Sequence, residues 1–338
     1  MHPGRSSRIL RTGACAADPT PETEAPKAQT PAAGAVKTGL SMVTDIAKSK
    51  DASADGNGVA QTNIALVAVT VSDDGVIDDC VIDAIQAKIE FGADGKIVTP
   101  LETEFVSKNV LGADYGMSKA SSIGKEWNEQ AAAFAEYAKG KTVEELKGIA
   151  VDENGKATDA DLAATVTLSL ADFLPGIEDA VNKAQHLGAQ AGDRLALTSI
   201  TTMSKSKDAS ADGDGKAQAY ASVAAVTLKD STVTSCYIDA VQANVTFDLT
   251  GKITCDVTAL QPSKNELGAD YGMAKASSIG KEWNEQIAAF CAYVTGKTLD
   301  EVAGIAVNDA DAPADADLAA SVTMGIGDYQ KLLAMAAE

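Results

Sequence analysis

One loop motif, which occurs at two places in the chain, carries the side chains best suited to bind an ion. The sequences DASADGNG (51–58) and DASADGDG (208–215) place Asp and Ser at alternate positions before a glycine: Asp51, Ser53 and Asp55, or Asp208, Ser210 and Asp212. This spacing resembles the start of an EF-hand calcium loop, which is completed by a glutamate at position 12. Thr62 and Ala219 stand there instead. Calcium binding and a plain acidic loop between strands are both open.

A second repeated motif, SSIGK, precedes a predicted helix in both copies. Its hydroxyls, its backbone N–H groups and its lysine could hold a phosphate at the start of that helix. The residues concerned are Ser121, Ser122 and Lys125 in the first copy, and Ser277, Ser278 and Lys281 in the second. The motif is not a Walker loop, because the lysine is followed by Glu. Ordinary helix capping is the other interpretation of this motif, and it is the one favoured here. The neighbouring turns at Tyr115-Gly116-Met117 and Tyr271-Gly272-Met273 either line a pocket or pack under the helix.

Histidine and cysteine are too few for several kinds of active site. The two histidines, His2 and His186, lie in a leader and a connector, which argues against a Ser-His-Asp triad or a histidine metal site. No nucleophile–base pair indicates a hydrolase or transferase, so the chain is not predicted to be an enzyme. Cys80 and Cys236 occupy equivalent positions on a predicted strand and are expected to be buried thiols. Two further cysteines occur only in the second copy, Cys255 and Cys291, and are either a disulfide pair or two unrelated thiols.

The composition indicates a globular protein with a strongly acidic surface. The chain has 338 residues, of which 45% are hydrophobic and 22% charged, and its formal net charge is −20. This charge argues against nucleic acid as a partner and against docking to an anionic membrane. No stretch approaches 18 apolar residues, so no transmembrane segment is predicted.

Residues 1–36 are predicted to be a disordered leader and tether. They are rich in Pro, Thr, Ala and Glu and nearly lack large apolar residues. The leader contains RTGAC, which ends in Cys15 and resembles the lipid-attachment site of a bacterial lipoprotein. Thr12 stands where such sites usually have Leu or Val, and the preceding residues contain no signal-peptide apolar run. Lipidation of Cys15 and an incidental cysteine are both open.

An internal duplication divides the rest of the chain. The sequence at 107–130 returns at 263–286 with 22 of 24 residues identical, and KSKDASADG occurs at 48–56 and 205–213. Copies of about 150 residues are too long for solenoid units. We therefore expect two tandem homologous domains, at 37–186 and 187–338, joined near 184–193. Each is expected to have its own core and to be stable alone.

The pattern of each copy predicts an α+β fold with a mostly antiparallel sheet. The expected order is four strands, two helices, a strand and a closing helix. The named segments of the first copy are strands at 62–72, 76–85, 87–91 and 163–170 and helices at 124–140, 142–150 and 172–184. Asp172 is the expected N-cap of the last helix, with Pro175 in its first turn. Trp127 and Trp283 are expected to be core anchors on the main helix.

The layout resembles the FMN-binding-domain family of extracellular lipoproteins from Gram-positive bacteria. Members often carry tandem domains behind a lipidated cysteine, and their strands show the pattern V-x-V-x-D-G-x-I, which VAVTVSDDGVIDDCVID (67–83) matches. Family domains end in S/T-G-A-T-x-S/T, where FMN is attached to the Thr through its phosphate. The resemblance places Thr167 and Thr323 at that position. The family's Gly is replaced by Thr165 or Ser321, so the attachment motif is degraded, and the resemblance implies either a relative that has lost the flavin or one that binds FMN without a covalent link.

Two functions from different classes are therefore open. The first is a bacterial cell-surface flavoprotein that transfers electrons, with FMN near Thr167 or Thr323 and the SSIGK motifs and a redox protein as its partner. The second is a cofactor-free surface module that serves as a spacer, a binder or an antigen. The low content of aromatic residues, 4%, favours the second, because flavin rings usually stack on aromatic side chains. Both place the protein outside the cell or on its surface.

Overall fold

Each repeat opens with three long strands that form one antiparallel sheet. The computed structural model describes residues 34–337. The strand order follows the sequence in both sheets, so each sheet is built from two successive hairpins. The strands are β1 (Lys37–Asp45), β2 (Gly58–Val71) and β3 (Ile77–Phe91) in the first repeat, and β4 (Arg194–Thr202), β5 (Gly215–Lys229) and β6 (Thr232–Phe247) in the second.

These sheets confirm the α+β class and differ from the prediction in the strand count. The predicted strands at 76–85 and 87–91 are one continuous strand, β3, which pairs with β2 over its whole length. The prediction did not name β1, which pairs with β2 from Lys37 opposite Val71 to Asp45 opposite Asn63. The turn between β2 and β3 contains Gly75 at φ 81°, as the SDDG sequence predicts.

The helices follow the sheet in both repeats, and the main helix lies where its apolar spacing predicts. They are α1 (Lys108–Leu111), α2 (Trp127–Ala138), α3 (Val143–Lys147), α4 (Ala160–Ala163) and α5 (Leu174–Lys183), then α6 (Lys264–Leu267), α7 (Trp283–Val294), α8 (Leu299–Ala303), α9 (Ala316–Ala319) and α10 (Gly327–Met335). Short 3-10 turns complete the set: Gly112–Tyr115, Met117–Lys119, Leu170–Asp172, Gly268–Tyr271 and Met273–Lys275.

Two local predictions near the end of the first repeat are wrong. The segment 163–170 is not a strand. The Asp159 carboxylate caps the one-turn helix α4, which ends at Ala163, and the Thr167 N–H beyond it donates to the Gln130 side chain and not to a neighbouring strand. Asp172 is not the N-cap of α5: it belongs to a 3-10 turn, and Phe173 occupies the cap position without a side-chain hydrogen bond.

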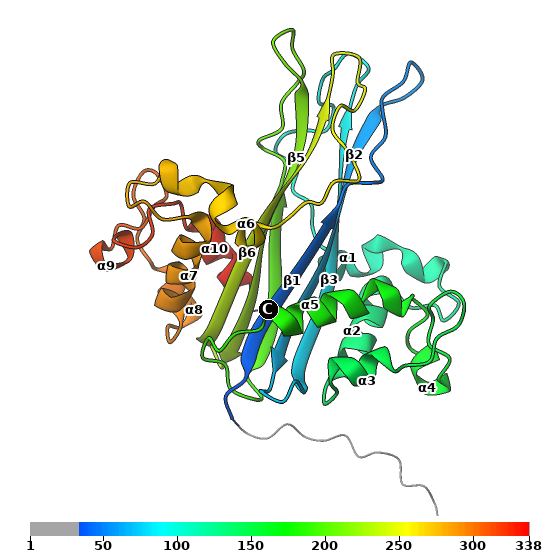
Figure 1. Cartoon of the computed structure of the whole chain (residues 1–338), viewed down its shortest axis with the longest axis vertical. Helices are drawn as coiled ribbons and strands as arrows, with labels where there is room; N and C mark the ends of the chain where they lie inside the picture. The colour runs from blue at the N-terminus through cyan, green and yellow to red at the C-terminus, as the bar shows by residue number, and fades with distance from the viewer. Residues whose placement is uncertain (1–33, 338) are drawn as a thin grey trace, which may run out of the picture. The chain divides into compact units, whose positions relative to one another are not determined.

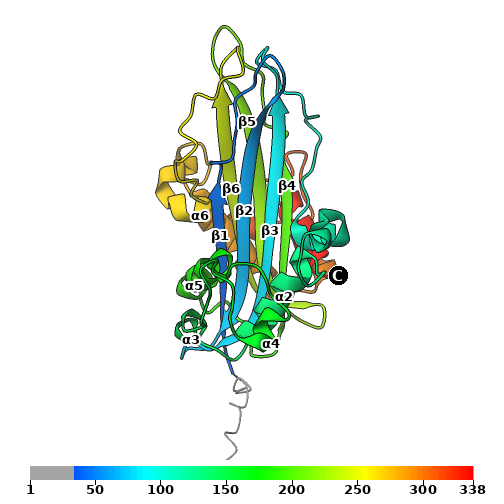
Figure 2. The ribbon, with the colours of Figure 1, turned by 90° about the vertical axis from the view of Figure 1, so that its right-hand side faces the viewer.

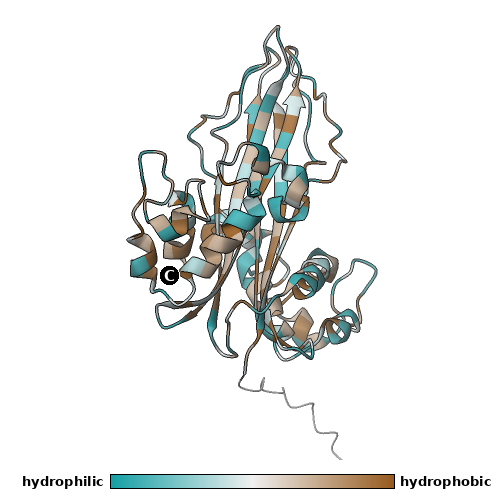
Figure 3. Cartoon of the chain, turned by 60° about the vertical axis from the view of Figure 1, so that its left-hand side comes forward, coloured by the Kyte–Doolittle hydropathy of each residue, from teal (hydrophilic) through white to brown (hydrophobic). Residues whose placement is uncertain are grey.

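The described chain stacks into four layers, helices outside and the two sheets inside. In Figure 1 the helices of the first repeat lie on one side of the strands and those of the second on the other. Figure 2 shows α2 and α5 in front of the strands of the first sheet, and α2 and α5 pack on β1, β2 and β3. Figure 3 shows hydrophobic segments along the strands between the helices. Each sheet is therefore covered on both faces where the helices lie, which explains why β2 is buried on both faces from Leu66 to Val71 and alternates between buried and half-buried residues from Gly58 to Ala65.

The two repeats share part of their hydrophobic core. Two buried clusters belong to single repeats and lie under the helices, and each contains the predicted anchor, Trp127 or Trp283. Two further clusters lie between the sheets and contain residues of both repeats. At the centre of one of them the rings of Phe91 and Phe247 stack with centroids 4.2 Å apart. The expectation of separate cores thus holds for the outer faces and is wrong for the inner ones.

The DASADG loops join one repeat to the other. The Asp51 carboxylate accepts a hydrogen bond from the N–H of Ile253 at 2.8 Å, and Asp208 accepts one from Ile97 at the same distance. The backbone makes the same reciprocal contacts. The Ala52 N–H donates to the Gly251 carbonyl, and the Ala209 N–H donates to the Gly95 carbonyl. No group of three or more His, Cys, Asp or Glu side chains in residues 34–337 could hold a metal ion. The repeated acidic motif thus forms reciprocal hydrogen bonds that connect the two repeats.

The connector between the repeats lies against the start of the described chain. Val36 is buried and its N–H donates to the Ala189 carbonyl, while Ala191 N–H donates to Gly34. Residues 34–36, which the sequence assigned to the tether, thus belong to the fold. The remainder of the predicted leader, with Cys15, lies outside the described residues. Within the described part, no helix is long and apolar enough to cross a membrane.

Candidate functional site

One buried glutamine joins the predicted phosphate-binding residues of each repeat. Gln130 on α2 is fully buried; its side-chain amide donates to Ser121 Oγ at 3.1 Å and to the Lys125 carbonyl at 3.2 Å. Its Oε1 accepts from the N–H of Thr167 at 2.8 Å and from the Thr167 hydroxyl at 3.1 Å. Gln286 makes the same contacts in the second repeat with Ser277, Lys281 and Thr323.

This network explains why the Ser, Lys and Thr residues of each repeat lie together. It also occupies the Ser121 and Thr167 hydroxyls and the Lys125 carbonyl, which are bonded to Gln130. A buried amide needs partners for its donors and acceptor, and the Ser and Thr residues supply them. Ser122 and Ser278 stand outside the network and are exposed. The predicted residues therefore form a structural brace between the SSIGK turn, the main helix and the segment after α4.

The start of the main helix already holds carboxylates. Glu126 and Glu129 form a capping box, in which the Glu129 carboxylate accepts the Glu126 N–H at 2.8 Å. The Glu126 carboxylate also accepts the Met117 N–H at 2.7 Å, and its hydrogen bond with Ser118 lowers the pKa of Glu126. A phosphate at this helix start would meet these carboxylates, so this position does not favour an anion.

A lysine lies against two aromatic rings, one of which is the anchor tryptophan. The Lys108 ammonium lies 4.6 Å from the ring centroid of Tyr115 and 4.7 Å from that of Trp127. Among residues 34–337, no carboxylate oxygen lies within 4 Å of this ammonium. The rings stabilise the charge by cation–π attraction and leave its N–H donors for another partner.

This lysine lines a pocket of about 470 Å³ between the first sheet and the helices. The volume lies within the range of small-molecule sites. Trp127, Tyr115 and Phe173 supply aromatic walls, and Val67 and Ile82 supply part of the sheet side. Gly176 lets α5 approach closely, because a Cβ there would lie 2.8 Å from Val67. Three acidic residues also line the pocket, Asp45, Asp83 and Asp172, and Lys48 joins Lys108 as a second cation.

The second repeat has the same cage in a smaller pocket, of about 310 Å³. Lys264 lies 4.7 Å from the Tyr271 ring and 4.9 Å from the Trp283 ring. Strand register aligns Tyr220 of this repeat with Asn63 of the first, since they pair with Gln242 and Gln86 respectively. The Tyr220 hydroxyl accepts a hydrogen bond from Lys264 at 3.1 Å. In the second repeat, the Tyr220 side chain thus occupies a space that the shorter Asn63 side chain leaves open in the first repeat.

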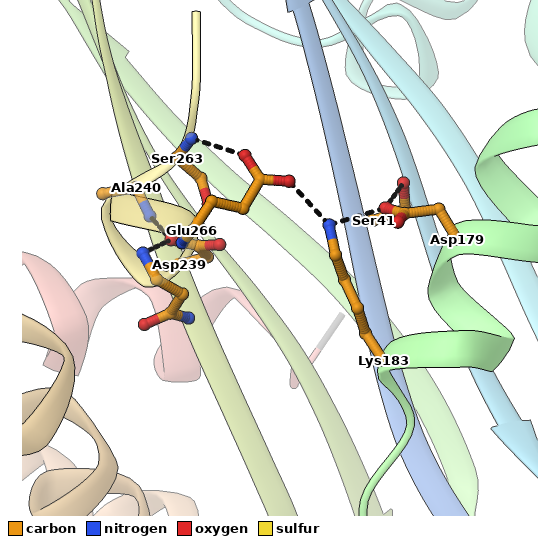
Figure 4. A network of polar contacts seen from close by, with 8 residues as sticks. Ser41, Asp179, Lys183, Asp239, Ala240, Ser263 and Glu266 are labelled. Carbon is orange, nitrogen blue, oxygen red and sulfur yellow. Dashed lines mark hydrogen bonds and ion pairs between the residues drawn. The ribbon is translucent and has the colours of Figure 1, made fainter. Parts of the chain in front are cut away.

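A buried aspartate fixes the short helix that carries each lysine. Asp83 Oδ1 accepts the N–H groups of Ala84 at 2.7 Å and Asn109 at 3.0 Å, and Asp239 does the same with Ala240 and Asn265. Figure 4 shows Asp239 beside the α6 turn. In the same view Glu266 accepts the Ser263 N–H and pairs at 2.8 Å with Lys183, which also binds Asp179. The anchor of α6 is thereby tied to α5 of the first repeat.

Asp239 makes a testable contribution to the pH dependence of stability. Burial raises its pKa to about 6, although its hydrogen bonds with Ser263 and two backbone N–H groups oppose the shift. Between pH 4 and 6 the folded state holds this proton while the unfolded chain has released it, so the free energy of unfolding falls as pH rises. The difference between a pKa of about 6 and the usual value of 3.8 corresponds to about 3 kcal/mol of unfolding free energy.

We expect Asp239→Asn to remove this contribution to the pH dependence and to be more stable than the parent at pH 7. Urea denaturation at pH 4.5 and 7 checks it, and identical slopes for both proteins would contradict it.

The four cysteines in the described part of the chain are free thiols, and Cys255 and Cys291 do not lie together. Cys80 and Cys236 are buried, as predicted. Cys291 lies not beside Cys255 but beside Cys236, with the two Sγ atoms 3.2 Å apart. Cys255 is on the far side of the second sheet, against the cluster between the sheets, and its Sγ is near the Asn244 carbonyl. Of the two alternatives, a Cys255–Cys291 disulfide is therefore contradicted, because Cys291 of the outer helix lies beside Cys236 of the strand under it.

The pocket residues were only partly visible in the sequence. Tyr115 and Tyr271 were named as pocket candidates and do line the pockets, and Met324 and Gly325 of the second pocket directly follow Thr323. Lys108 and Lys264 were missed. A signal was present, since both lie inside the nearly identical 24-residue block that also contains the cage tyrosine and tryptophan.

A comparison of the chain with models of protein families, with curated proteins and with solved structures finds no match.

Proposed function

We propose that the protein is a binding protein whose first repeat holds a planar aromatic ligand with a hydrogen-bond-accepting or anionic group, and that the flavin of FMN is the first candidate. The observation that carries this proposal is Lys108, a cation against two aromatic rings in a pocket wall, with no carboxylate oxygen of residues 34–337 within 4 Å of its ammonium. The aromatic walls suit a flat ring, and the ammonium suits its polar edge.

The comparison between repeats supports the first repeat as the binding site. The two pockets share the lysine, the tyrosine and the tryptophan, but in the second Tyr220 occupies the space and bonds the ammonium. In the first, Asn63 is shorter and bonds Asp45, Gln61 and Gln86 instead. One repeat thus offers an open cation, and the other a satisfied one.

The start of α5 supports an anionic group on the ligand. Asp172, Phe173, Pro175 and Gly176 line the pocket, and no side chain of residues 34–337 caps the first turn of this ten-residue helix. The backbone N–H groups that remain at this helix start attract negative charge, although Pro175 has no N–H and the Asp172 carboxylate opposes that attraction. The phosphate of FMN is therefore proposed near this turn and not at Thr167, whose hydroxyl is bonded to Gln130.

Titration with FMN, followed through the quenching of flavin fluorescence, tests this proposal. We expect Lys108→Met to weaken binding about tenfold to a hundredfold, the worth of one charge-assisted hydrogen bond. Asn63→Tyr copies the second repeat and is expected to abolish binding by filling the pocket. Lys264→Met is the matched control and is expected to leave the affinity unchanged.

Three results would overturn the flavin site. They are no quenching at high protein concentration, equal losses in the Lys108 and Lys264 variants, or undiminished binding in Asn63→Tyr with a parent-like thermal melt. The first would leave the cofactor-free surface module as the better account. Riboflavin, which lacks the phosphate, separates the contribution of the ring from that of the helix start.

The setting of this activity is part of the same proposal. The resemblance to surface lipoproteins and the tether sequence support attachment outside a bacterial cell through Cys15, and a bound flavin would then pass electrons to a surface redox partner. Labelling of the native-host protein with a radioactive fatty acid, compared with a Cys15→Ser variant, tests the anchor. Equal labelling of both would exclude Cys15.

A further inference from the structure

We propose that Cys236 and Cys291 form a redox-active dithiol, which closes to a disulfide when a low-molecular-weight disulfide enters the cavity beside it. The two Sγ atoms are 3.2 Å apart, one on β6 and the other on α7. A disulfide requires the two sulfur atoms to approach to about 2.05 Å, a small movement from this separation. The pair is independent of the lysine pocket and of its ligand.

A cavity of about 570 Å³ gives this pair access to a small reagent. Both cysteines line it, together with Tyr237, Asn265 and Asn284. His186 and its neighbours in the connector form another wall. Asn284 adds an unused acceptor, because its buried Oδ1 has no hydrogen-bond partner among residues 34–337. The cavity thus offers polar contacts to a peptide-like disulfide beside two thiols.

The order of attack follows from exposure and hydrogen bonding. Cys291 is 7% exposed and Cys236 2%, and Cys236 donates its S–H to Cys291. The Cys291 thiolate attacks the disulfide R–S–S–R, and one R–S⁻ leaves. The Cys236 thiolate then attacks Cys291 Sγ and expels the second R–S⁻. Two thiol protons are released, and two electrons pass from the cysteines to the reagent.

The environment of Cys236 makes the second step, the attack on Cys291 Sγ, slow near neutral pH. The hydrogen bond to Cys291 and then burial raise the pKa of Cys236 well above its usual value. The thiolate is the nucleophile, so the rate is expected to increase with pH. The uncharged Asn265, Asn284 and Thr295 face the pair from the cavity wall, while His186 and Tyr237 are the titratable groups there. The resulting bond would join the outer helix to its sheet across a separation of 55 residues.

The first repeat supplies a matched control. Cys80 occupies the position of Cys236, but Ala135 stands on α2 where Cys291 stands on α7. The variant Cys291→Ala therefore introduces a residue that the fold accepts at the equivalent site. The converse variant, Ala135→Cys, is expected to create a second reactive pair with Cys80.

The test uses the full chain, reduced and then incubated with excess glutathione disulfide at pH 8. Free thiols are alkylated after unfolding, and tryptic peptides are analysed by mass spectrometry. Cys236, Cys255 and Cys291 fall in three different peptides, 230–252, 253–264 and 282–297, so each pairing is distinguishable. We expect a Cys236–Cys291 link in the folded protein, Cys255 and Cys80 without an intramolecular partner, and a thermal midpoint about 5 °C higher after oxidation.

Each other outcome would overturn the proposal. These are full alkylation of both cysteines after prolonged oxidation, a stable mixed glutathione disulfide without ring closure, a link through Cys255, or a link that forms only in urea. The circular dichroism spectrum of the oxidised protein decides whether the link is compatible with the native fold. Parent-like oxidation of Ala135→Cys, without a link between Cys80 and the introduced thiol, would show that the geometry of helix over strand is not the cause.

Discussion

Residues 34–187, produced alone, are expected to form a homodimer and not a stable monomer. Without the second repeat the inner face of the first sheet would lie open, with buried apolar side chains such as Leu66, Ile89 and Phe91 exposed to water. A second copy of the same repeat can cover that face, because the contacts between the repeats are reciprocal. Asp51 of one copy would cap Ile97 of the other, as it caps Ile253 in the full chain.

Sedimentation equilibrium and thermal melts at several concentrations check this expectation. The thermal midpoint of the isolated repeat should rise with concentration, whereas that of the full chain should not. Asp51→Ala should weaken the dimer, because it removes the cap from the Ile97 N–H. A monomer with a cooperative, concentration-independent melt would contradict the expectation and restore the idea of two independent domains.

The elements of each repeat were predictable where the signal is local. The alternation along β3 and the apolar spacing of α2 depend on near neighbours, and both elements stand close to their expected positions. The segment 163–170 has β-branched residues but is not a strand, because Asp159 caps a helix and the Thr167 N–H bonds Gln130, which is 37 residues away. The strand propensity of these residues was therefore overridden by the hydrogen bond to Gln130, a residue that is distant in the sequence.

The sharing of the core could not be predicted from the same pattern. The strand at 62–72 is apolar on both faces, which indicates that both are covered. It does not indicate by what: the helices of its own repeat cover one face, and the sheet of the other repeat covers the second. Because the chain contains two copies of this strand, its apolar pattern is compatible with two separate domains and with two repeats that share a core.

The candidate site shows a similar division. Repeated Ser and Thr residues were expected near one another, and they are, but a buried glutamine that no motif singled out joins them. Lys108 was missed because a lysine in a polar turn looks like an ordinary surface residue. Its role depends on Tyr115 and Trp127, and only the fold brings all three together. For Cys291, comparison of the repeats identified the unusual residue but not its partner.

The Phe91→Ala substitution is expected to cost about 3–5 kcal/mol of unfolding free energy, the usual loss for a buried aromatic residue. Phe91 is completely buried and stacks on Phe247 at an interplanar angle of 7°. The backbone is shaped around the rings, since a Cβ on Gly58 would lie 2.4 Å from the Phe91 ring, and Gly215 stands in the same relation to Phe247. Little rearrangement can therefore close the cavity.

Because this pair joins the two sheets, its loss should weaken the interface and not one repeat alone. We expect Phe247→Ala to cost a similar amount and the double variant to cost less than the sum, since each single variant also removes the stacking partner of the other ring. Phe105→Ala, at a partly buried ring of the same cluster, is the matched control and should cost less. Urea denaturation of the parent, the two single variants at Phe91 and Phe247 and the double variant gives the coupling free energy directly. A loss below about 1 kcal/mol for either ring would mean that the sheets do not depend on this contact, and would remove the main reason to expect that an isolated repeat needs a second copy.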